Sequence, residues 1–237
     1  MVIYGINTVT EALRGGRVKS VRVETPPRSR LRALVRMAEA SGIVVRRCTD
    51  AQLLRSSQGR PHQGVVAEVD QPRDYSLDDL LGANNNPLLV VLDGIEDPQN
   101  LGAILRTAEA AGVDGVIRQS RRAARLDGVA SKVSAGAVAH LRLVRVVNIA
   151  RTLDTLKAAG VWTVGFDGSA SHRYDQVDLT RPTAVVLGGE GRGIRRLVRE
   201  RCDWLVSIPM AGQLTSLNVS VAAGIALFEA VRQRTTV

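Results

Sequence analysis

The chain has 237 residues, of which 45% are hydrophobic and 23% charged, as expected for one large or two small globular domains. Its two cysteines, Cys48 and Cys202, are too few and too far apart for a disulfide framework or a metal cluster, so we expect no metal. No apolar run approaches the roughly 20 residues of a membrane span, and the first residues do not resemble a signal peptide. We therefore expect a cytoplasmic protein without a membrane partner.

The charge of the chain is uneven. The formal net charge is +9. Residues 1–70 contain 12 Lys and Arg against 6 Asp and Glu, whereas residues 71–237 contain 20 against 17. This excess favours a polyanionic partner, most often a nucleic acid, bound mainly by the first part of the chain. A basic surface that is merely solvated is the alternative.

The first 70 residues predict a small α/β domain. Hydrophobic periodicity predicts helices at about 7–13, 30–40 and 50–55, and strands at 18–23, 43–45 and 64–69. The next stretch, residues 71–87, is polar and ends in Asn84-Asn85-Asn86-Pro87, so we interpret it as a linker.

From Leu88 to the C-terminus, apolar strands alternate with helices, which is typical of a parallel sheet covered on both faces. The expected strands are 88–92, 115–117, 141–144, 161–165, 183–187 and 204–208. The expected helices are about 102–111, 130–137, 149–159, 194–201 and 216–233. No Gly-x-Gly-x-x-Gly follows the first of these strands, so the dinucleotide-binding fingerprint is absent where it would be expected.

Three segments in the last third of the chain have main-chain groups that a ligand could approach closely. Leu187–Gly193 has four glycines directly after an apolar run, and glycine leaves the backbone free of Cβ atoms. Ile208-Pro209-Met210 ends the next strand, and Ser216–Ser220 follows a few residues later. Together they suit a planar ligand that is bound largely by the main chain. Two ordinary strand-to-helix turns would explain the first two segments equally well.

Two further segments carry polar residues that a core does not need. After the strand at 88–92, Asp97 or Asn100 can cap the helix that contains Arg106, whose guanidinium either pairs with Glu109 or faces a cleft. Near the C-terminus, Ser216 and Asn218 begin a helix of small and apolar residues. Such a helix favours packing against another element or another chain over exposure to water.

Three blocks carry a resemblance to a known family. They are Asp97-Pro-Gln-Asn-Leu-Gly-Ala-Ile-Leu-Arg106, Leu187-Gly-Gly-Glu-Gly-Arg-Gly193, and Ile208-Pro-Met followed by Ser216-Leu-Asn-Val-Ser220. In this order they resemble the three motifs of the SpoU/TrmH family, S-adenosylmethionine-dependent RNA ribose 2′-O-methyltransferases of the SPOUT class. The resemblance covers residues 88–237 and extends into residues 1–70, where Tyr4-Gly5 and His62–Ala67 are similar to the family's small RNA-binding domain.

The resemblance implies an α/β fold whose C-terminal parallel sheet is threaded as a deep trefoil knot, and a homodimer. It implies domains at 1–70 (RNA substrate binding) and 88–237 (SPOUT methyltransferase), joined by the linker 71–87. It also implies a pocket for S-adenosylmethionine, formed largely by the main chain of Gly188, Ile208 and Leu217 with their neighbours Gly189 and Met210. The catalytic residues that it implies are Asn100, Arg106, Glu190, Ser216 and Asn218.

The role of Arg106 stays open between two possibilities. The family resemblance implies a general base, but a guanidinium has a pKa above about 12 and is effectively always protonated. A cationic Arg106 that grips the neighbouring phosphate and stabilises a developing alkoxide needs no unusual pKa.

Within the family, the two-domain arrangement and the ending Leu227–Arg234 are most similar to enzymes that methylate a guanosine ribose of 23S ribosomal RNA. The same chemistry on transfer RNA, or at a ribosomal RNA site that confers antibiotic resistance, is an alternative. So is a non-catalytic RNA-binding protein, against which the presence of Arg106, Glu190, Ser216 and Asn218 argues.

Overall fold

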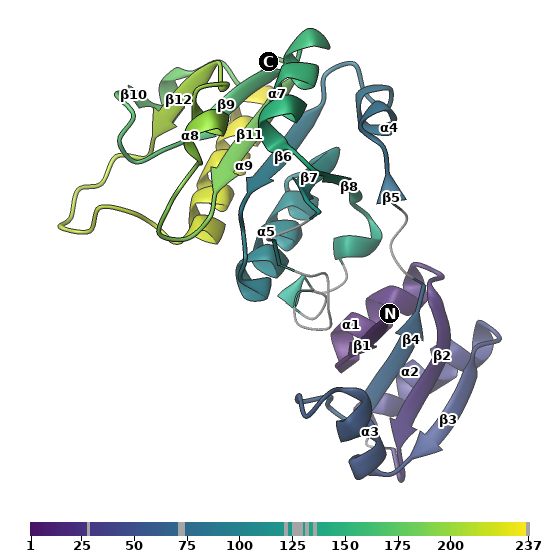
Figure 1. The fold of residues 1–237 in the computed structure, drawn as a ribbon. Coiled ribbons are helices and arrows are strands. Elements are labelled where there is room, and N and C mark those ends of the chain that lie inside the picture. The colour runs from purple at the N-terminus through teal and green to yellow at the C-terminus, as the bar shows by residue number, and fades with distance from the viewer. Residues whose placement is uncertain are drawn as a thin grey trace. The chain divides into compact units, whose positions relative to one another are not determined.

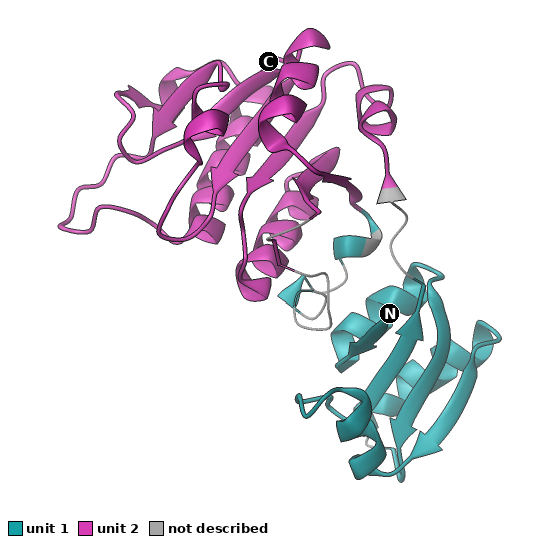
Figure 2. Ribbon diagram, viewed as in Figure 1, with its two compact units in different colours: residues 1–72, 125–140 teal, residues 73–124, 141–237 magenta. Residues whose placement is uncertain are grey.

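The computed structural model describes residues 1–27, 29–70, 74–120, 123–124, 130, 133–134 and 137–235. The chain divides into two compact units, residues 1–72 with 125–140 and residues 73–124 with 141–237 (Figure 2). Within the described residues no helix is both long and apolar enough to cross a membrane.

The first unit is built on a four-stranded sheet in the order β1-β4-β2-β3, in which only β2 and β3 run parallel. Its strands are β1 (Val2–Tyr4), β2 (Val18–Glu24), β3 (Val44–Cys48) and β4 (Val65–Val69). Its helices are α1 (Ile6–Arg14), α2 (Ser29–Ala40) and α3 (Asp50–Ser56). The larger core lies between the sheet and helices α1 and α2, and a smaller cluster of Tyr4, Leu53 and Val66 lies under α3 on the other face.

The second unit is an eight-stranded sheet in which every neighbouring pair is parallel, as the strand-helix alternation predicted (Figure 1). The order is β10-β12-β9-β11-β6-β7-β8-β5. These strands are β5 (Asp74–Tyr75), β6 (Leu88–Asp93), β7 (Gly115–Gln119), β8 (Arg142–Val146), β9 (Trp162–Phe166), β10 (His172–Arg173), β11 (Thr183–Gly188) and β12 (Trp204–Ser207).

Helices cover both faces of this sheet. Apolar side chains of α4 (Leu77–Leu81), α7 (Ile149–Ala158) and the segment leading into α8 (Arg196–Arg199) join one core cluster with the central strands. Helices α5 (Pro98–Ala110) and α9 (Val219–Thr235) pack against each other on the opposite face (Figure 1). Short 3-10 turns lie at Ala137–Ala139 and Tyr174–Gln176.

Several boundaries differ from the sequence prediction. Residues 74–81, which lie in the stretch interpreted as a linker, form β5 and α4 and belong to the second unit. A capping box between Ser76 and Asp79 starts α4, and Leu80 is fully buried in the sheet core. The last helix begins at Val219 rather than at residue 216, because the side chain of Asn218 accepts hydrogen bonds from the amide and hydroxyl of Ser220. Half of the residues of the helix expected at 130–137 lie outside the described residues.

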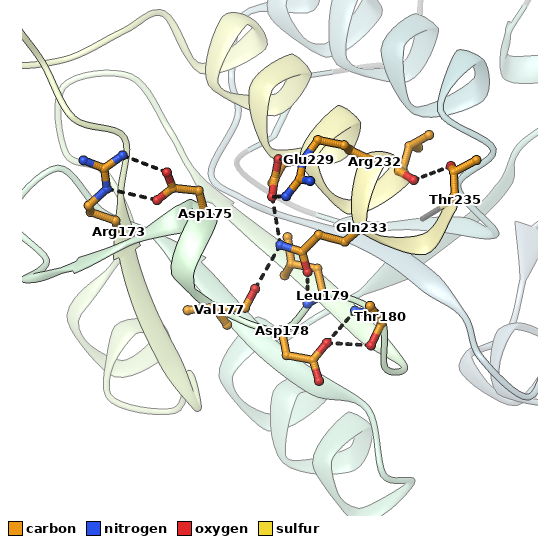
Figure 3. A network of polar contacts seen from close by, with 11 residues as sticks. Arg173, Asp175, Val177, Asp178, Leu179, Thr180, Glu229, Arg232, Gln233 and Thr235 are labelled. Atoms are coloured by element: carbon orange, nitrogen blue, oxygen red, sulfur yellow. Dashed lines mark hydrogen bonds and ion pairs between the residues drawn. The ribbon is translucent and has the colours of Figure 1, made fainter. Parts of the chain in front are cut away.

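The last turns of α9 are bonded to the segment that leads into β11 (Figure 3). The Gln233 amide nitrogen donates to the Val177 carbonyl, and its oxygen accepts from the Leu179 amide. Arg234 donates to the carbonyls of Leu179 and Arg181 and, from the segment before β6, to those of Asn86 and Pro87. The C-terminal end of α9 is therefore fixed to the entrance of two central strands.

Candidate functional site

A cavity of about 540 Å³ lies at the carboxyl ends of β9, β11 and β12. The chain order of the sheet reverses between β6 and β11: β7 and β8 follow on one side of β6, whereas β9 and β12 lie on the other side of β11. Ligands of open α/β sheets bind at such a switch point, beyond the carboxyl ends of the strands. The residues that line the cavity come from three segments, each a strand end with the loop that follows it: 166–168, 187–193 and 206–222, the last of which reaches into α9.

Most of the residues assigned to the site by sequence line this cavity. The predicted cofactor residues Gly188, Gly189, Ile208, Met210 and Leu217 all do so, as do Glu190, Ser216 and Asn218. Asn100 and Arg106 do not line it, although Asn100 is hydrogen-bonded to residues that do. The three motifs therefore converge in space.

The glycine loop packs against itself and against the end of β6. A Cβ added at Gly188 would lie 2.0 Å from the carbonyl carbon of Gly193, and one added at Gly189 would lie 2.2 Å from the carbonyl oxygen of Gly94. Gly191 and Gly193 have φ of 79° and 62°, a region that favours glycine. Gly188 and Gly189 are therefore needed because backbone segments contact each other at these positions. Because the glycines of the loop have no side chains, its main chain is accessible along the cavity.

A buried carboxylate holds the far side of this loop. Asp93, at the end of β6, is only 1% exposed. It accepts a hydrogen bond from the Arg195 amide at 2.8 Å and is ion-paired to the Arg195 guanidinium. Because the backbone at Asp93 also accepts from the Gly189 amide at 2.9 Å, both ends of the glycine loop are bound to one residue.

Asn100 joins the glycine loop to the loop before α9. Its amide nitrogen donates to Glu190 Oε1 at 2.5 Å, and its oxygen accepts from Asn218 Nδ2 at 3.0 Å. Asn100 is 9% exposed, and Asp97 caps α5, so Asn100 is free for this bridging position. Of the two capping residues that the sequence offered, Asp97 is the one that caps.

Arg106 is exposed on α5, six residues after Asn100, and does not contact the cavity. No hydrogen bond or ion pair joins it to a described residue, Glu109 included. The guanidinium is therefore available to a ligand outside the protein itself.

Asp167 also lines the cavity, although it belongs to none of the three motifs. Burial alone would raise the pKa of this carboxyl, but hydrogen bonds from the Ser169 hydroxyl and amide and the charge of Arg199 outweigh burial and lower the pKa. Asp167 is therefore ionised at neutral pH. The signal in the sequence was a polar residue shortly after the predicted strand 161–165, at the same end of the sheet as the glycine loop.

Among the described residues, no group of three or more His, Cys, Asp or Glu side chains is placed to hold a metal ion.

The fold and the site define a class of protein: a two-unit α/β protein with a ligand cavity at the switch point of a parallel sheet, built around a glycine loop. Residues 87–228 match the SpoU rRNA methylase family, and residues 2–75 match the RNA 2′-O ribose methyltransferase substrate-binding family. The chain belongs to the SpoU rRNA methylase family, which confirms the resemblance.

Among curated relatives, a protein of Yersinia pestis named 23S rRNA (guanosine-2′-O-)-methyltransferase RlmB is 46% identical over 98% of this chain and 97% of its own length. The protein of the same name from Escherichia coli K12 is 45% identical over 98% of both chains. Among solved structures, the SpoU methyltransferase AviRb from Streptomyces viridochromogenes in complex with its cofactor AdoMet has a TM-score of 0.84. It is 30% identical, covering 100% of this chain and 91% of its own.

Proposed function

We propose that this protein transfers a methyl group from S-adenosylmethionine to the ribose 2′-oxygen of a guanosine in 23S ribosomal RNA, in the cytoplasm. The observation that carries the proposal is that two of the three family motifs line one cavity and the first is hydrogen-bonded to both of them through Asn100, in a chain whose full-length relatives bear the name of this activity. These relatives favour ribosomal RNA over transfer RNA as the substrate.

The cavity suits S-adenosylmethionine. Peptide groups of residues 188–193 can bond a planar base, and Leu187, Ile208 and Leu217 provide apolar contacts. The cofactor is cationic at sulfur and anionic at its carboxylate, and the lining of the cavity includes both acidic residues, Asp167 and Glu190, and the basic residue Arg192. When bound, S-adenosylmethionine supplies an activated methyl group, so the protein chiefly supplies placement, which can contribute roughly 7–11 kcal/mol to lowering a barrier.

The reaction also requires the ribose hydroxyl of the substrate to be activated. A ribose hydroxyl is weakly acidic, so negative charge develops on its oxygen as it reacts. Arg106, exposed on α5, would hold an adjacent RNA phosphate with its guanidinium group and stabilise this charge. Asn100 would act as a positioning residue, because it fixes Glu190 and Asn218 rather than pointing to the cavity.

Removing the Asn100 bridge is expected to weaken S-adenosylmethionine binding by about tenfold and to lower the free energy of unfolding by about 1–3 kcal/mol. The reason is that Asn100→Ala leaves partners on two loops unsatisfied. Titration calorimetry and chemical denaturation measure the two effects. The matched control is Asn84→Ala, which also removes two side-chain hydrogen bonds, one donated to Asp114 and one accepted from the Asn86 amide, at an exposed place away from the cavity. Equal effects of the two substitutions would contradict a positioning role.

Helix α9 presents an apolar surface that supports a homodimer. Val221 and Phe228, seven residues apart on one side of the helix, are 50% and 51% exposed, and Leu214 in the preceding loop is 75% exposed. A stripe of this kind on a helix that already packs on α5 fits a second copy of the chain. We further propose that residues 1–70 serve as the RNA-binding domain, that the second unit serves as the methyltransferase domain, and that the chain after β11 is threaded as a trefoil knot.

The proposed function is tested with the purified full chain, S-adenosylmethionine and unmodified transcripts of 23S ribosomal RNA and transfer RNA. We expect methylation of the ribosomal transcript at a single guanosine ribose, located by reverse transcription at limiting nucleotide. Methylation of transfer RNA alone, or of a base instead of a ribose, would contradict the proposal.

A further inference from the structure

Two arginines stand side by side on the sheet of the first unit. In the parallel pair β2–β3, Arg22 lies directly opposite Arg46. The same register continues across the sheet to Val66 and Tyr4, so Arg22 and Arg46 project from the face that α3 partly covers. Neighbouring strands are about 4.8 Å apart, which brings the two side chains into one local site.

This arrangement is unfavourable for the protein alone. Like charges directly opposite each other on neighbouring strands destabilise a sheet. Arg22 donates a hydrogen bond to the Ser56 hydroxyl at 2.9 Å, which fixes its guanidinium without neutralising it. Among the described residues, neither Arg22 nor Arg46 forms an ion pair with a carboxylate. The pair thus lacks an anion that it could share.

The face is open on the side of the pair that α3 leaves uncovered. Helix α3 packs over Tyr4, Val66 and Cys48 and reaches Arg22 through Ser56, whereas Arg46 is exposed. The next row holds Val2, Glu68, Ser20 and Val44, of which Val2 is 39% and Val44 58% exposed. Glu68 is the acidic residue of that row, and its charge attracts the ammonium group of Lys19. An extended ligand can therefore reach both guanidinium groups across an uncovered strip of sheet.

We propose that this open face, centred on Arg22 and Arg46, binds the phosphodiester backbone of the substrate RNA, with one phosphate shared by the two guanidinium groups. The inference rests on the proposed function, which makes RNA the polyanion that is available. Planar guanidinium groups bind phosphate oxygens in pairs, so a shared phosphate would convert the repulsion into two charge-assisted contacts. The exposed Val2 and Val44 would flank the backbone with apolar surface.

The test compares two double variants of the full chain with the same change in charge. Arg22→Gln with Arg46→Gln alters the proposed face. Arg32→Gln with Arg36→Gln alters exposed arginines of α2, which packs on the opposite face of the same sheet. Affinity for an unmodified 23S ribosomal RNA transcript is measured at several salt concentrations, and affinity for S-adenosylmethionine is measured in parallel.

The first double variant is expected to bind the transcript about tenfold more weakly and to reduce the salt slope of log K by about 1, as for the loss of one phosphate contact. The α2 variant is expected to change both values much less, and neither should alter cofactor affinity. Arg46→Gln alone should leave the melting temperature unchanged or raised, because it removes a like-charge contact. Equal losses in both double variants would reduce the effect to overall charge and overturn the proposal, as would unchanged RNA affinity in the first. A wild-type protein that binds the transcript but does not methylate it would instead contradict the proposed function.

Discussion

Replacing Arg106 by alanine is expected to reduce methyl transfer by at least a thousandfold while cofactor affinity stays within about twofold of the wild type. The first effect follows from losing the charge that holds phosphate and stabilises the developing alkoxide. The second follows because Arg106 lies outside the cavity lined by the three segments. A methylation assay and calorimetry with S-adenosylmethionine measure the two quantities on the same preparation.

Two further variants make this result specific. Arg106→Lys keeps the charge but loses the planar fork, so it should also be inactive if a bidentate phosphate contact matters. Arg151→Ala removes an exposed arginine from α7, which packs on the other face of the sheet, and should retain activity. Substantial turnover by Arg106→Ala would remove this residue from the mechanism, and a fully active Lys variant would reduce its role to a point charge.

Substituting valine for Gly188 is expected to weaken S-adenosylmethionine binding by at least a hundredfold. The new Cβ would lie about 2 Å from backbone atoms of Gly193 and Ile194, so the glycine loop could not keep its path along the cavity. Gly212→Val is the matched control, because a Cβ at Gly212 meets no atom within 4 Å. Calorimetry gives the affinities.

The same experiment needs a check on folding. Oligomeric state and the far-ultraviolet circular dichroism spectrum should match those of the wild type, since the clash is confined to one loop. Gly193→Val has a different defect, a φ of 62° without a nearby atom, and should therefore weaken binding less than Gly188→Val. A folded Gly188→Val protein with normal cofactor affinity would place the ligand site elsewhere.

The strands of the second unit were predictable because buried parallel strands are continuous apolar runs, as in β6 and β11. The segment 74–81 was misjudged as a linker because its acidic residues masked a capping box and a single buried leucine. The three residues of β1 were too few to show a period, and only pairing with β4 identifies them as a strand.

The parts of the site that are formed by the main chain were predictable from the sequence. A cluster of glycines after one predicted strand and a proline after another can each be recognised within a single short segment. The bond from Asn100 to Glu190 is not, because it joins residues 90 positions apart and depends on β6 and β11 being neighbours. Asp167 was missed for the same reason: its strand end reaches the cavity only through the order of the sheet.

Helix α9 is held at both ends, by Asn218 at its start and by Gln233 and Arg234 at its last turn. A shift by one helical turn, about 5.4 Å, would break all of these bonds together. The helix therefore links the cavity to the segments that lead into β6 and β11, and its position along its axis is fixed. Torsions within residues 208–217, the segment between β12 and α9, can therefore widen the cavity without breaking these bonds. The glycine loop, bonded to Asp93 at both of its ends, lacks this freedom.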